Sequence, residues 1–137
     1  MEAIPLGITG CYDTVPGPGH TAAALGNPGV EVVGTPFLIG YLEIAAHSAI
    51  FPYCEAGEAT VGTRIEVDHL APALPGRPVV TEARVIAVDG RRVLFEVELR
   101  QGERLIMKGR HGRAIVDLEK LLARVAPQDR RDAPATS

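Results

Sequence analysis

The sequence predicts a domain of the α+β class, in which one long helix is followed by an antiparallel β-sheet that encloses it. Residues 35–53 carry apolar side chains around nearly the whole circumference of a helix, a pattern typical of a helix that other elements cover. Beyond Glu58 the apolar residues recur at every second position, and short polar turns separate these stretches. Together the two patterns indicate a buried helix followed by a meander of strands.

Composition is consistent with one globular domain and argues against several other classes of protein. The 137 residues, 46% of them hydrophobic, suffice for a core that needs no metal or disulfide. A net charge of −3 and an aromatic content of 4% argue against nucleic-acid binding, which requires cationic patches and stacking platforms. Cys11 and Cys54 lack the spacing of a metal or redox motif, so we expect no metal and no cofactor. Since no leader and no membrane-spanning stretch is recognisable, we expect a cytoplasmic protein.

Glycine and proline mark the approach to the helix and its two ends. Residues 15–34 hold many of both and predict a long irregular loop, which is typical of a lid or binding loop. Thr35 followed by Pro36 predicts the start of the helix, with threonine as the N-cap and proline in the first helical position. Pro52 lies near its expected end.

Four stretches predict strands, because apolar and polar side chains alternate in them. Asp89-Gly90 between two of them predicts a tight hairpin. We expect one domain over residues 1–126, closed by a short helix over residues 117–126, and a disordered polar tail over residues 127–137. The four predicted strands are residues 64–68, 79–88, 93–100 and 104–116.

Glu43 is the most informative candidate for chemistry, because it lies in the middle of the apolar helix. A buried carboxylate requires a partner or becomes neutral through a raised pKa, and such groups gather at functional sites. The alternative is that Glu43 occupies one exposed stripe and pairs with His47 one turn further on. The residues alone favour neither interpretation.

His69 and Arg113 are candidates on the predicted strands. His69 lies on the same side of its strand as Ile65 and Val67, and histidine is suited to proton transfer near neutral pH, although a histidine on an apolar side is also a common core residue. Arg113 lies on the inner side of the last strand, where it requires a carboxylate or a ligand anion as partner. His111 shares that side, which leaves open that this end of the strand reaches solvent.

Thr35 and Gly62 are weaker candidates. The Thr35 hydroxyl lies at the positive end of the helix dipole, where a developing oxyanion is favoured, but helix capping explains this threonine equally well. About 12 Å of helical rise separates Thr35 from Glu43, so we expect no direct contact between them. Gly62, beside a strand, would allow backbone N–H groups to approach a ligand.

Five segments form a combined pattern: GTPFLIGYLE at 34–43, EATVGT at 58–63, HLAPALPG at 69–76, VDGRR at 88–92 and GRAIVDLEK at 112–120. In this order they resemble the fluoroacetyl-CoA thioesterase family of the hotdog superfamily. The resemblance implies a hotdog fold, in which an antiparallel β-sheet wraps around one long central helix. It also implies a homodimer, or a larger assembly built from it, whose sheets join and whose active sites lie at the subunit interface.

The resemblance further implies that Thr35, Glu43 and His69 are catalytic and that Gly62 and Arg113 contact the substrate, an acyl-CoA. The chain departs from the family pattern at two places. Residues 26–31, GNPGVE, contain none of the bulky aromatic residues that the fluoroacetyl-specific member carries in its lid, which points to a different, larger acyl group. Pro36 also lacks a backbone N–H that could donate to a substrate oxygen.

These observations predict an acyl-CoA thioesterase. In this hypothesis Glu43 acts as a general base on water or as a nucleophile, and His69 assists proton transfer to the leaving thiolate. Thr35 polarises the thioester carbonyl, and Arg113 holds the acyl or pantetheine end. Two alternatives stay open: a hotdog hydratase or dehydratase that acts on an enoyl thioester, and a non-catalytic protein that binds acyl-CoA for self-protection.

Overall fold

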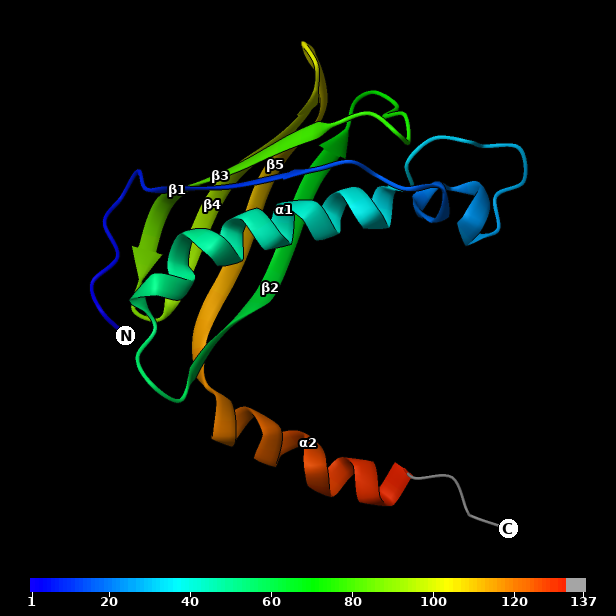
Figure 1. Cartoon of the computed structure of the whole chain (residues 1–137). Helices are drawn as coiled ribbons and strands as arrows, with labels where there is room; N and C mark the ends of the chain where they lie inside the picture. The colour runs from blue at the N-terminus through cyan, green and yellow to red at the C-terminus, as the bar shows by residue number, and fades with distance from the viewer. Residues whose placement is uncertain (133–137) are drawn as a thin grey trace.

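A single antiparallel sheet of five strands wraps around one long helix (Figure 1). The computed structural model describes residues 1–132, with side chains described through Ala126. The strand order is β1-β3-β4-β5-β2, so β1 and β2 are the two edges of the sheet. The strands are β1 (Thr9–Thr14), β2 (Glu58–His69), β3 (Val79–Asp89), β4 (Arg92–Gln101) and β5 (Arg104–Asp117).

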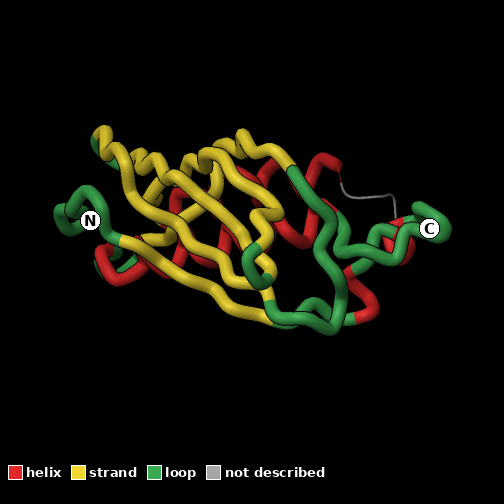
Figure 2. Tube along the Cα trace, turned by 90° about the horizontal axis from the view of Figure 1, so that it is seen from above, coloured by secondary structure: helices red, strands yellow, loops and turns green. Residues whose placement is uncertain are grey.

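Helix α1 (Thr35–Ile50) lies across the concave face of the sheet, which covers it as one layer when the molecule is seen from above (Figure 2). Leu38, Leu42 and Ala45 of the helix are fully buried, as are Phe95 and Leu99 of the sheet. Strand β1 passes so close to the helix that only glycine fits at position 10. A Cβ on Gly10 would overlap the backbone carbonyl oxygen of Ala45.

One face of α1 remains open, in contrast to the expectation of a helix buried on all sides. Glu43 and His47 are half-buried, and Ile44 is exposed by 43%. Phe51, in the 3₁₀ turn Phe51–Tyr53 that ends the helix beside Pro52, is exposed by 55%. This face of α1 therefore presents two large apolar side chains at the surface.

The start of α1 also differs from the prediction. Gly34 is the N-cap, and Thr35 and Pro36 occupy the first two helical positions. Thr35 makes no capping hydrogen bond, because its hydroxyl is used by a residue far away in the sequence. The helix therefore begins one residue earlier than predicted.

The loop before α1 is more regular than the glycine and proline content indicates. It contains the 3₁₀ turns Pro18–His20 and Ala23–Leu25, and a bridge between Thr21 and Val33 closes it. The Ala22 and Ala23 backbone N–H groups also donate to the carbonyl oxygens of Val32 and Val30 on the opposite side of the loop. The predicted irregular loop is thus a compact flap at the beginning of α1 (Figure 1).

Helix α2 (Leu118–Asp132) leaves the sheet after Asp117 and projects from the body of the domain (Figure 1). The Asp117 carboxylate accepts a hydrogen bond from the Lys120 backbone N–H, as a helix cap does. The helix extends beyond the predicted end at Ala126, and the part of the expected tail over residues 133–137 lies outside the described residues. Within residues 1–132, no helix combines the length and the apolar character that crossing a membrane would require.

Candidate active site

Thr35 and His69 meet although 34 residues separate them in the chain. Thr35 stands in the first turn of α1 and His69 is the last residue of β2, and Thr35 Oγ1 lies 2.8 Å from His69 Nδ1. After His69 the chain is fastened to β5, because the Leu70 and Ala71 backbone N–H groups donate to the Ile106 carbonyl. The imidazole is exposed, so the interpretation of His69 as a core residue on an apolar side is wrong.

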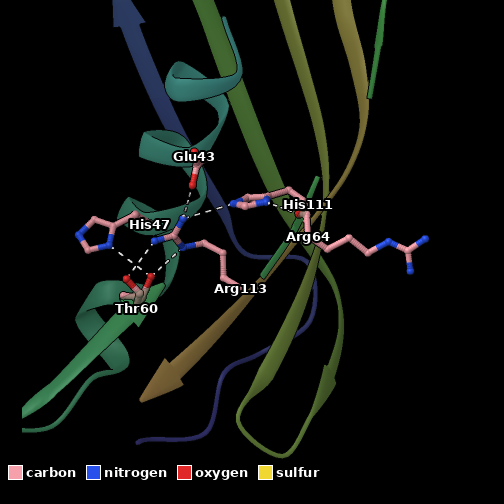
Figure 3. A network of polar contacts seen from close by, with 6 residues as sticks. All are labelled: Glu43, His47, Thr60, Arg64, His111 and Arg113. Carbon is pink, nitrogen blue, oxygen red and sulfur yellow. Dashed lines mark hydrogen bonds and ion pairs between the residues drawn. The ribbon is translucent and has the colours of Figure 1, made fainter. Parts of the chain in front are cut away.

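Glu43 pairs with Arg113, and not with His47 as the alternative expectation had it (Figure 3). Arg113 Nη1 lies 3.5 Å from Glu43 Oε2, and the exposed fractions of the two side chains are 7% and 43%. Glu43 is therefore a half-open carboxylate whose buried partner is a cation. Such a carboxylate can accept a proton or attack a substrate that enters from the open face of α1.

Gly62 of β2 leaves the room that the Glu43 carboxylate occupies. A Cβ at this position would lie 2.7 Å from Glu43 Oε2 and 3.6 Å from Arg113 Nη1. The rigid His111 ring would lie at an ordinary contact distance of 3.4 Å, so the close atom is the end of the flexible Glu43 side chain. A side chain at position 62 would therefore displace the Glu43 carboxylate and leave the backbone in place.

Arg113 is itself held by residues that the sequence did not single out as functional. Its Nε–H donates to Thr60 Oγ1 at 2.7 Å, and Nη2 donates to the Thr60 carbonyl at 3.0 Å. Its Nη1 lies 3.3 Å from His111 Nε2 (Figure 3). The signal that could have indicated His111 is its position two residues before Arg113 on the inner side of the same strand. His111 is fully buried, so this strand end does not emerge into solvent there.

Burial and the guanidinium set the protonation of the surrounding groups. Burial, followed by the charge of Arg113, lowers the pKa of His47 below its ordinary value. Burial is also the main cause of the lowered pKa of His111, again with a contribution from Arg113. Burial lowers the pKa of Arg113 too, and Glu43 opposes that shift. Both histidines are therefore neutral near pH 7.

The five residues expected at the site fall into two groups within one chain. Thr35 and His69 form one pair at the beginning of α1, while Glu43, Gly62 and Arg113 gather in the middle of the helix and of β2. In the described chain, Glu43 makes no hydrogen bond to Thr35 or His69, in agreement with the predicted separation of Thr35 from Glu43. The first group can polarise a carbonyl, and the second can supply a base or a nucleophile.

Comparison with known proteins places this geometry in a family. The model of the fluoroacetyl-CoA-specific thioesterase family matches residues 17–119, which include all of these side chains. The chain belongs to this family. Among curated relatives, the fluoroacetyl-CoA thioesterase of Streptantibioticus cattleyicolor is 41% identical over 95 residues, which cover 69% of this chain and 68% of that protein.

Solved structures of the family have the same fold. A structure of the fluoroacetyl-CoA thioesterase FlK superimposes with a TM-score of 0.85 at 35% identity, over 92% of this chain and 98% of that chain. A thioesterase superfamily member of Thermus thermophilus gives a TM-score of 0.88 at 34% identity, over 96% and 97% of the two chains. The hotdog fold and the thioesterase family predicted from the sequence are thereby confirmed.

Proposed function

We propose that this protein hydrolyses the thioester bond of an acyl-CoA, with Thr35, Glu43 and His69 as catalytic residues and Gly62 and Arg113 as substrate-binding residues. The observation that carries the proposal is the half-open Glu43 carboxylate, which lies beside the buried guanidinium of Arg113 in space left by a glycine. Membership in a thioesterase family supports the type of reaction.

The reaction requires a base, a group that polarises the carbonyl, and a proton for the thiolate. In one route Glu43 removes a proton from water while the water oxygen attacks the thioester carbon. In the other, a Glu43 oxygen attacks and forms an acyl-enzyme anhydride, which water then hydrolyses. In both, the carbon–sulfur bond breaks as the tetrahedral intermediate collapses. The Thr35–His69 pair donates a hydrogen bond to the developing oxyanion and passes a proton to the leaving thiolate. The proton that Glu43 took from water, or that hydrolysis of the anhydride releases, then returns to the pair and closes the cycle.

We propose that the active enzyme is a homodimer formed through β2. This strand of 12 residues is an edge of the sheet, and an unpaired edge of that length invites pairing with a second strand. Ile65 on β2 and Ile44 and Phe51 beside it are exposed apolar side chains that such pairing would cover. A two-fold axis makes the two β2 strands antiparallel, so that the His69 end of one strand lies beside the half of the other strand that contains Glu58 and Gly62.

In this dimer the Thr35–His69 pair of one subunit and Glu43 of the partner subunit face one cavity. The test mixes two inactive homodimers, Thr35→Ala and Glu43→Gln, and allows subunits to exchange. If residues of both subunits form each site, a mixed dimer contains one intact site, and about a quarter of wild-type activity returns after random exchange. If each site is built within one chain, every site in the mixed dimer carries a defect, and the mixture stays inactive.

The test of the reaction itself is thiol release from short, branched and aryl acyl-CoAs by the wild type, Glu43→Ala and His69→Ala. Release that both substitutions abolish supports the thioesterase. A product that retains its thioester would indicate a hydratase instead. Tight binding of acyl-CoA by folded protein with no release would indicate a protein that sequesters acyl-CoA.

We propose that the acyl group differs from the fluoroacetyl group named for the relatives. The flap carries no aromatic side chain over residues 26–31, and its exposed Leu25 reaches the backbone beside Thr35 instead. A Cβ on Gly34 would lie 2.8 Å from Leu25 Cδ1. An aliphatic flap without a bulky ring leaves room for a larger acyl chain.

We also propose that residues 1–126 act as one catalytic domain in the cytoplasm. Cys11 and Cys54 are both free thiols, which is the usual state in a reducing compartment.

A further inference from the structure

Three of the four contacts of the Arg113 guanidinium are with Thr60 and His111, which the proposed reaction does not use. A guanidinium has five N–H donors, and four contacts account for four of them in turn. Thr60 receives two of these bonds, through its hydroxyl and its carbonyl oxygen. His111 and Glu43 lie at the Nη1 group, at 3.3 Å and 3.5 Å. The contact with Glu43 is the longest of the four, and it alone involves a half-open side chain.

The directions of these hydrogen bonds follow from the chemistry of the partners. The Arg64 carbonyl can only accept, so His111 Nδ1, 2.8 Å away, carries the proton. Arg113 can only donate, so His111 Nε2 presents its lone pair to Nη1. Thr60 Oγ1 accepts from Arg113 Nε, and its own hydrogen is therefore free to donate to His47 Nδ1 at 3.3 Å. One arrangement of protons satisfies every member (Figure 3).

We propose that Thr60 and His111 are positioning residues, which hold the Arg113 guanidinium in one orientation so that its Nη1 group faces Glu43. The inference rests on the proposed role of Glu43 and names the residues on which that role depends. A guanidinium without these partners has several rotamers open to it, and the contact at 3.5 Å is too long to hold it alone. Phe95, whose ring stacks on His111 at a centroid distance of 6.2 Å, fixes the imidazole from the other side.

Two nearly isosteric substitutions test the proposal. Thr60→Val removes the hydroxyl and keeps both the volume and the carbonyl, whereas Thr60→Ser keeps the hydroxyl. We expect Thr60→Val to lower kcat at least about tenfold, because a buried hydrogen bond to a charged group is lost, and Thr60→Ser to restore most of the rate. His111→Leu should resemble Thr60→Val, and His111→Gln, which can still present an acceptor to Arg113, should lose less.

Thr81→Val is the matched control. Thr81 is also buried in the same sheet, and its Oγ1 has no hydrogen-bond partner among the described residues. The control removes the same hydroxyl without touching Arg113, so we expect unchanged kcat and KM. If Thr81→Val lowers kcat as much as Thr60→Val does, the loss reflects the packing of the sheet and the proposal is overturned.

A double-mutant cycle separates positioning from a general structural effect. In an Arg113→Met background, Thr60→Val and His111→Leu should each change the residual rate less than about twofold, because their target is gone. Additive losses would overturn the proposal. Folding and dimer content are measured for each variant, so that rates are compared between equal amounts of native protein.

A second measurement does not depend on activity. The Arg113 Nε–H group, buried and bonded to Thr60, should give a separate ¹⁵N–¹H signal that exchanges slowly with water in the wild type and is lost in Thr60→Val. If no acyl-CoA is hydrolysed but this signal behaves as expected, the proposed function fails and the positioning stands. If the signal exchanges freely in the wild type, the positioning fails, whatever the activity.

Discussion

Gly62→Ala is the substitution whose effect the structure predicts most directly. The new methyl group would lie 2.7 Å from Glu43 Oε2, and ordinary contacts begin at 3.4 Å. The carboxylate must therefore retreat by the difference, 3.4 − 2.7, or about 0.7 Å. Misplacement of a reacting group by about 1 Å costs on the order of a hundredfold in rate. We expect kcat for thioester hydrolysis to fall between about tenfold and a hundredfold.

The fold should tolerate the same substitution. Gly62 does not adopt a left-handed φ, and the displaced atom is the end of a flexible side chain. Replacing glycine with alanine in a strand stabilises a protein by about 0.5–1 kcal/mol when no strain results. Thermal unfolding of Gly62→Ala should therefore occur at or above the wild-type temperature, although its activity is low.

Thiol release and thermal melts of three proteins test this reasoning: the wild type, Gly62→Ala and Gly17→Ala. Position 17 is the control, because a Cβ there meets no atom within 4 Å. Full activity of Gly62→Ala would refute the argument that the glycine makes room for a working carboxylate. A large loss of stability would refute the argument that Glu43 is free to move.

Three further predictions concern stability. Folding lowers the pKa values of His47 and His111, so the unfolded chain binds protons at a higher pH than the native protein does. The free energy of unfolding should therefore be highest above about pH 6.5 and should fall as the pH drops and the histidines of the unfolded chain become protonated. Urea unfolding at about pH 7.5 and about pH 5.5 will measure the difference. Equal unfolding free energies at the two pH values would contradict this. Thr81→Val should raise the free energy of unfolding by about 1 kcal/mol, because a buried hydroxyl without a partner is removed; a decrease would show that the hydroxyl has a partner after all. Gly10→Ala should destabilise the protein by about 1–3 kcal/mol or more in chemical denaturation, because the methyl group meets the backbone of α1, and a neutral result would mean that β1 can move away from the helix.

Local patterns in the sequence explain why the predicted elements were found. The change from helical to twofold apolar periodicity near Glu58 coincides with the start of β2, and Asp89-Gly90 lies at the turn between β3 and β4. These signals depend on neighbours in the chain, which is the information that a sequence contains directly. The N-cap was misplaced because the prediction assumed a local use for the Thr35 hydroxyl, and its partner is His69.

The exposure of His69 was missed for a similar reason, although its side of the strand was predicted correctly. Strict alternation carried from Ile65 to His69 places the histidine on the apolar side, but that side is covered only where α1 packs against the sheet. At the edge strand β2 even Ile65 stays exposed by 37%. Parity determines which side a residue faces, whereas burial depends on what lies opposite.

By itself the sequence determined the α+β architecture, the order of α1 and the four strands that follow it, and the residue types on which the family resemblance depends, whereas β1 before the helix was missed. Only the tertiary structure decided which of those residues meet. Thr35 reaches His69, Glu43 reaches Arg113, and Thr60 and His111 surround the guanidinium, across separations of 34, 70, 53 and 2 residues. The three contacts over 34 or more residues arise from the curvature of the sheet around α1, and that curvature is a property of the packed core that no local pattern encodes.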